Sequence, residues 1–77
     1  MQFPSKEIVE SVRRMYPPGT RVELIRMDDP QAPPMGTQGT VWGVDDTASI
    51  MVHWDNGSNL HVIYGEDIVR IVHETDD

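Results

Sequence analysis

Two histidines, His53 and His61, are the side chains of this sequence with the clearest capacity for chemistry. Their imidazoles could share a metal ion if they lay diagonally across neighbouring strands, but a zinc site needs further protein ligands, and none has suitable spacing. The chain has no cysteine, which excludes thiolate ligands, thiol nucleophiles and disulfides. We therefore expect no metal and no cofactor, and we expect both histidines to face solvent or a partner.

Two pairs of adjacent carboxylates, Asp28-Asp29 and Asp45-Asp46, could attract a hard cation. Calcium-binding loops need more oxygen ligands in a fixed order. Aspartate is also frequent in turns, because its side chain accepts hydrogen bonds from nearby backbone N–H groups. Turn formation is therefore the interpretation we adopt for both pairs.

The serines and the glycine-rich stretch show no catalytic or phosphate-binding pattern. No serine lies in an elbow motif beside a predicted base and an oxyanion-stabilising donor. The segment Gly36-Thr37-Gln38-Gly39-Thr40 has two glycines but lacks the lysine and the helix that follow a phosphate-binding loop. The sequence therefore predicts a protein that is not an enzyme.

Length and charge restrict the remaining possibilities. A chain of 77 residues is expected to form one domain, and at this size it buries only about 60% of its unfolded surface, so most apolar residues must enter one core. Six basic side chains against 13 acidic ones give a net charge of −7, which disfavours general nucleic-acid binding. No apolar run approaches the roughly 18 residues of a membrane span, and no secretory signal is recognisable. We expect a cytoplasmic protein.

The elements that must position these residues follow from periodicity. Ser5 is a suitable N-cap for a helix over residues 5–16, which Pro17-Pro18-Gly19 ends. From Thr20 the apolar period is two. It predicts strands from residue 21 towards 27, over 40–44, 49–54 and 58–64, and around 70–72, with one helical turn at 65–67. Five short strands after a long first loop predict a small, strongly bent β-barrel over residues 20–72, followed by an acidic tail at 73–77.

The last hairpin of the predicted barrel sets which side chains face inward. A three-residue loop Asp55-Asn56-Gly57, with Gly57 in the left-handed conformation, pairs Trp54 with Ser58. A two-residue turn would shift the register by one and put polar groups into the core. The inward face then consists of Ile50, Val52, Trp54, Leu60, Val62 and Tyr64.

The preceding hairpin, with residues 45–48 as a four-residue loop, places Val41 opposite Val52 on the inside. The outward face then carries two rows of side chains across three strands. One row consists of Trp42, Met51 and His61, and the next of Thr40, His53 and Asn59. The sequence leaves two positions open for the helix: packed on these rows, which would make Trp42 a core residue, or at an open end of the barrel, which would leave the rows exposed.

The motifs Gly39-Thr40-Val41-Trp42-Gly43-Val44-Asp45 and Val52-His53-Trp54-Asp55-Asn56-Gly57-Ser58 resemble the strands of SH3-like small barrels. From residue 3 to about residue 72, the chain is similar to an uncharacterised family of short bacterial and phage proteins, the domain-of-unknown-function family four-three-one-four. The resemblance implies a mainly β fold, a five-stranded SH3-like small barrel with one N-terminal helix, and a phage or mobile-element context. It implies no activity and no site.

Our functional hypothesis is a non-enzymatic protein-binding or adaptor module. The partner-binding residues are expected in the outward rows and, as a second contact, in the loop from residue 28 to 35; they are Trp42, Met51, His53, His61, Asp28, Asp29 and Met35. One alternative is an acidic effector that imitates nucleic acid on a host enzyme. Another is weak binding of single-stranded nucleic acid by stacking on the aromatic side chains. The expected partner is another protein, and the chain is expected to be a monomer or a weak dimer paired through strand edges.

Overall fold

The computed structural model describes residues 4–73. The only helix among them, α1 (Lys6–Met15), begins where the sequence predicts it: the Ser5 hydroxyl accepts a hydrogen bond of 3.2 Å from the N–H of Ile8. Val9 and Val12 form its buried side. No helix in this part of the chain has the length and hydropathy needed to cross a membrane. The predicted tail at 73–77 lies outside the described residues except for His73.

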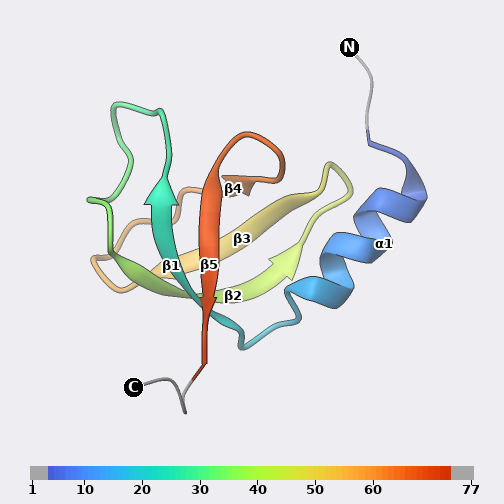
Figure 1. Cartoon of the computed structure of the whole chain (residues 1–77), viewed down its shortest axis with the longest axis horizontal. Helices are drawn as coiled ribbons and strands as arrows, with labels where there is room; N and C mark the ends of the chain where they lie inside the picture. The colour runs from blue at the N-terminus through green and yellow to red at the C-terminus, as the bar shows by residue number, and fades with distance from the viewer. Residues whose placement is uncertain (1–3, 74–77) are drawn as a thin grey trace.

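Five strands form one antiparallel sheet (Figure 1). They are β1 (Arg21–Arg26), β2 (Gln38–Val44), β3 (Ser49–Trp54), β4 (Val62–Ile63) and β5 (Ile68–Val72), in the spatial order β4-β3-β2-β1-β5. This confirms a mainly β fold with one helix. Between residues 4 and 73 the sheet stays open, with β4 and β5 as its two edges, so the strands do not form a closed ring.

The last hairpin confirms the register predicted around the three-residue loop. The N–H of Trp54 donates to the carbonyl of Ser58 at 3.0 Å, and Gly57 has a φ of 94°. Ile50 pairs with Val62. Of the six side chains predicted to face inward, Ile50, Val52, Trp54 and Val62 are buried and Leu60 is half-buried.

The sixth of these side chains, Tyr64, was predicted to be inside and is 46% exposed. It lies beyond the end of β4, immediately before a turn in which the N–H groups of Glu66 and Asp67 both donate to the carbonyl of Ile63. The predicted strand at 58–64 was also too long, because only Val62 and Ile63 are in β4. The strand ends early, so the alternation that would have turned Tyr64 inward does not continue.

The hairpin between β2 and β3, which we call the first hairpin, has a loop one residue shorter than the predicted four-residue loop. The N–H of Asp45 donates to the carbonyl of Ser49, and Ala48, with a φ of 62°, donates to the carbonyl of Asp45, so the loop consists of residues 46–48. The extra residue is accommodated at Trp42 instead, because the register shifts between Val41 and Gly43. The predicted pairing of Trp42 with Met51 was therefore wrong, since Gly43 pairs with Met51. The pairs Thr40–His53 and Val41–Val52 are confirmed.

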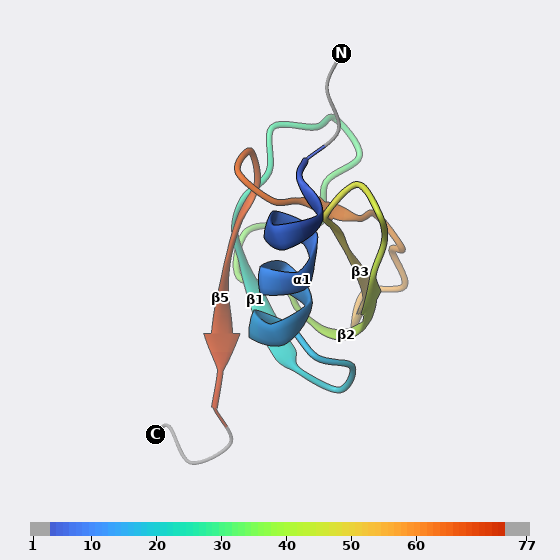
Figure 2. The same ribbon diagram turned by 90° about the vertical axis from the view of Figure 1, so that its right-hand side faces the viewer.

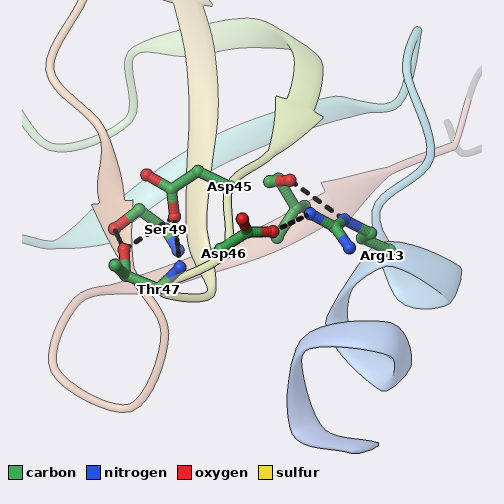
Figure 3. A network of polar contacts seen from close by, with 6 residues as sticks. Arg13, Asp45, Asp46, Thr47 and Ser49 are labelled. Carbon is green, nitrogen blue, oxygen red and sulfur yellow. Dashed lines mark hydrogen bonds and ion pairs between the residues drawn. The ribbon is translucent and has the colours of Figure 1, made fainter. Parts of the chain in front are cut away.

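Helix α1 lies at one end of the sheet, beside the loop between β2 and β3 (Figures 1 and 2). Val9 and Val12 join the buried core there. Arg13 fixes the contact, since its Nε donates to the carbonyl of Val44 at 3.1 Å and its guanidinium pairs with Asp46 at 2.9 Å (Figure 3). Trp42 is 47% exposed, so of the two helix positions that the sequence left open, the one at the end of the sheet is observed.

Candidate binding surfaces

The first candidate surface, which we call the outer face, consists of Trp42, Met51 and His53 on β2 and β3. The bulge at Trp42 changes its position relative to the neighbouring strand, and its indole stacks on the imidazole of His53 with ring centroids 5.4 Å apart and planes 18° apart. Met51 is half-buried, and its terminal methyl lies over Gly43, where an added Cβ would be 2.8 Å away. The outer face is therefore an ordered aromatic and thioether surface.

A polar network holds His53 from the other side. Its Nδ1 lies 2.9 Å from the side-chain oxygen of Asn59, and its strand partner Thr40 accepts a hydrogen bond of 3.0 Å from Arg21. The same guanidinium pairs with both carboxylate oxygens of Asp55, at 2.9 and 2.6 Å. The hydrogen bonds from Arg21 lower the pKa of Asp55, and the carboxylate in turn raises the pKa of Arg21. All three residues of the predicted second row, Thr40, His53 and Asn59, thus have a side-chain hydrogen-bond partner.

The acidic pair in the first hairpin is used within the fold. Asp45 accepts hydrogen bonds from the N–H groups of Thr47 and Ser49 and from the Thr47 hydroxyl (Figure 3). Burial alone would raise the pKa of Asp45, but these hydrogen bonds outweigh burial and hold it below the usual value. Asp46 is the partner of Arg13. The turn interpretation is thus confirmed for Asp45, and also for Asp29, which accepts from the N–H of Gln31 at 2.7 Å.

The second candidate surface is a cleft of about 420 Å³ between the start of the β1–β2 loop and the segment from Leu60 to Asp67. It brings together three predicted site residues, Asp28, Asp29 and His61, which are far apart in the sequence. Its lining includes four carboxylates and one guanidinium, so the cleft is acidic. The full lining is Arg26, Met27, Asp28, Asp29, Leu60, His61, Ile63, Glu66 and Asp67.

The structure thus divides the predicted site into two surfaces. Trp42, Met51 and His53 remain together on the outer face, whereas β4 starts only at Val62, so no strand pairing joins His61 to Met51. Met35 is 78% exposed on the β1–β2 loop and does not line the cleft. In residues 4–73, no three histidine, aspartate or glutamate side chains gather closely enough to hold a metal ion.

Sequence reasoning missed the other six lining residues of the cleft, of which three are charged, namely Arg26, Glu66 and Asp67. Glu66 and Asp67 were assigned only to a turn, and Asp67 does have a structural role there, because its carboxylate accepts from the N–H of Ile63 at 2.8 Å. The available signal was charge: Gly65-Glu66-Asp67 and Asp28-Asp29 are acidic turns in a chain with few basic residues.

Comparison with known proteins gives one positive result. A family model, described as a domain of unknown function (DUF4314), matches residues 5–72. Searches of the curated proteins and of the solved structures gave no match. With nearly the whole chain covered by that model, the protein belongs to the DUF4314 family.

Proposed function

We propose that this chain is a protein-binding module without catalytic activity, and that its partner contacts the outer face formed by Trp42, Met51 and His53. The observation that carries the proposal is the 47% exposure of Trp42. Burying a large apolar side chain contributes about 1.5 to 3 kcal/mol, and a small domain needs such contributions for its core. A tryptophan held on the surface by stacking is better explained by contact with another molecule.

The fold that we propose for this module is an SH3-like small barrel. The order β4-β3-β2-β1-β5 makes each strand from β1 to β4 a neighbour of the next, and it returns β5 to β1. Register shifts in β1, between Leu24 and Arg26, and in β2, at Trp42, are the kind of irregularity that bends a sheet. Figure 1 shows β2 strongly curved, as bending towards a barrel requires.

The test is a pair of variants compared in a pull-down from cell extract. The double variant Trp42→Ala with Met51→Ala should keep its fold, because both side chains lie on the outer face, and should lose the bound partner. Its control, Ile8→Ala with Ile25→Ala, removes side chains that are 45% and 39% exposed elsewhere and should keep the partner. Retention of the partner by the first variant, or its unfolding in circular dichroism, would contradict the proposal.

The acidic cleft favours a second candidate, an effector that imitates nucleic acid on the basic surface of a host enzyme. Asp28, Asp29, Glu66 and Asp67 surround it with only Arg26 as a counter-charge. Binding through these carboxylates should weaken strongly between low and high salt, whereas an apolar contact with Trp42 should hardly change. Loss of partner binding in Asp28→Asn with Asp29→Asn, together with competition by DNA, would favour this second function over the first.

A further inference from the structure

Strand β5 is an unprotected edge of the sheet. It pairs with β1 from Val72 opposite Arg21 to Ile68 opposite Arg26, and no other described strand lies against it. Alternate N–H and C=O groups of a strand with one neighbour point away from that neighbour and stay available for another strand. Figure 2 shows β5 at the periphery of the sheet, beyond β1.

The side chains of β5 are unusual for an exposed edge, which is generally protected by charges or proline. Four of the five are apolar: Ile68 is 49% exposed, and Val69, Ile71 and Val72 are half-buried. The single charge, on Arg70, is already paired with Glu23 of β1 at 2.8 Å. Apart from this one paired arginine, the side chains of β5 are apolar and favour the addition of a further strand.

The same edge borders an apolar groove of about 330 Å³ between β5 and the C-terminal end of α1. Tyr16 and Tyr64 line this groove together with Ile68 and Val69. Its remaining lining is Ile50, Val62, Gly65 and Asp67. A strand added beside β5 would place alternate side chains over this groove, so the edge offers apolar contacts as well as backbone hydrogen bonds.

We propose that the occupant of this edge is β5 of a second copy of the chain, paired antiparallel about a two-fold axis at Arg70. The order Ile-Val-Arg-Ile-Val is apolar on both sides of its centre. Antiparallel pairing about Arg70 therefore sets Ile68 against Val72 and Val69 against Ile71, so every position except the central Arg70 pairs apolar with apolar. A foreign strand would require no such symmetry.

Charge fits the same arrangement. The two Arg70 side chains meet at the axis, where like charges repel each other, but each is paired with its own Glu23 at 2.8 Å, so the row across the interface has no net charge. Each copy nevertheless carries a net charge of −7, which opposes association over longer distances. Salt screens that repulsion, so dimerisation should strengthen as ionic strength rises. Five residues of strand pairing form a small interface, and we expect a dimer that is populated only at high protein concentration.

Sedimentation equilibrium tests the proposal, with the expected mass rising from 8.7 kDa towards twice that value as concentration increases. The variant Ile68→Glu with Val72→Glu should stay monomeric. Its introduced carboxylates lie beside Arg26 and Arg21 within one copy, which favours the fold, but they oppose each other across the axis. The control Ile8→Glu with Ile25→Glu makes the same change of charge elsewhere and should still dimerise.

A mixing experiment checks the register. Ile68→Lys with Val72→Lys should not dimerise alone, but mixed with the corresponding glutamate variant it should form a heterodimer, because opposite charges then face each other across the axis. If the lysine variant does not fold, the glutamate variant at residues 68 and 72 and its control at residues 8 and 25 still test the proposal. A wild-type chain that stays monomeric at every concentration and salt level would overturn it, and so would equal loss of the dimer in the control.

Two further outcomes separate this proposal from others. If the wild-type chain is monomeric and the glutamate variant at residues 68 and 72 loses a partner in pull-down, the edge binds a foreign strand and the second copy is the wrong occupant. The proposal does not depend on the outer face: the Trp42→Ala, Met51→Ala variant should dimerise like the wild type. Failure of that prediction would place the dimer contact on the outer face instead.

Discussion

Two hairpins share strand β3 and have the same loop geometry but different environments. Each loop has three residues. In each, the N–H of the last loop residue donates to the carbonyl of the residue just before the loop, from Ala48 to Asp45 and from Gly57 to Trp54. Both donors have positive φ, 62° for Ala48 and 94° for Gly57. The two turns are therefore equivalent in backbone, and what differs is the set of side chains that hold them.

The first loop is held from several sides. Asp45 accepts two hydrogen bonds from Thr47 within the loop and one from Ser49 just after it, Ala48 is buried, and Arg13 of α1 pairs with Asp46. The second loop is held by the pairing of Asp55 with Arg21 and by the Asn56 side-chain oxygen, which accepts from the N–H of Ser58 at 3.1 Å. It has open space around Gly57, however, and only two residue pairs follow it in β4. There the indole N–H of Trp54 donates to the carbonyl of Leu60 at 2.9 Å.

The difference bears on both candidate surfaces. The well-held hairpin between β2 and β3 carries the outer face, so Trp42 and His53 keep their stacked positions without a partner. The second hairpin has a short final strand and leaves residues 58–61 outside any strand, and part of that segment, Leu60 and His61, lines the acidic cleft. The outer face is preorganised, whereas the cleft wall has few backbone hydrogen bonds to hold it.

The largest effect on this comparison is expected from Gly39→Ala in β2. A Cβ there would meet the Val52 side chain at 2.6 Å, the carbonyl of His53 at 2.8 Å and the Trp54 ring at 2.9 Å. Because backbone and core atoms must move, the variant should lose about 3 kcal/mol of unfolding free energy. Thermal unfolding followed by circular dichroism measures this as a fall in Tm of more than about 10 °C.

The matched control for this prediction is Gly43→Ala, on the same strand. Its added Cβ would meet only the terminal methyl of Met51, at 2.8 Å, and that flexible side chain can move away. The expected loss is below about 1 kcal/mol. Equal losses in the two variants would mean that the outer face is as tightly packed as the core, which would contradict the assignment of Met51 to a surface.

The register of β3 could be predicted because hydrophobic alternation leaves one choice. A shift by one residue would expose Val52 and bury His53, so parity alone decided which side chains point outward. The extra residue at Trp42 could not be predicted in the same way. The loop Asp45-Asp46-Thr47-Ala48 has no glycine to mark its residue of positive φ; that residue is Ala48, whose methyl is buried in the core.

The acidic cleft could not be predicted from the sequence, for a different reason. Asp28 and His61 were each proposed as contact residues, but no periodicity relates a loop after β1 to a segment before β4. Their proximity depends on the curvature of the whole sheet and on the early end of β4. The position of α1 could not be predicted either: so short a helix needs a docking place, but nothing in the sequence marks Arg13 as the residue that pairs with Asp46.

A medium effect is expected from Asp45→Asn, which removes the charge that stabilises the first loop. The variant should lose about 1 kcal/mol at pH 7, a typical value for a hydrogen-bonding side chain that holds backbone N–H groups. The folded chain lowers the pKa of Asp45, so its contribution is complete above the usual value of 3.8 and is lost as pH falls through the folded pKa. The difference from wild type should therefore shrink below about pH 4.

Urea unfolding at a series of pH values measures this dependence. Asp55 keeps a lowered pKa through Arg21 in both proteins, so the variant should still lose stability in acid, with a smaller slope than the wild type. A difference between the two proteins that stays constant from pH 7 down to pH 3 would mean that Asp45 acts through its shape and not through its charge.

The smallest effects come from exchanging the residue types at the two positions of positive φ. Gly57→Ala puts a side chain into open space but into left-handed backbone, and it should lose about 1 kcal/mol. Ala48→Gly relieves the same backbone strain but removes a buried methyl, worth about 0.8 kcal/mol, and makes the unfolded chain more flexible. These terms oppose each other, so its net change should lie within about 0.5 kcal/mol. If Ala48→Gly instead stabilises the chain clearly in urea unfolding, the methyl contributes little, and the stability of the first hairpin must come from Asp45 and Arg13 alone.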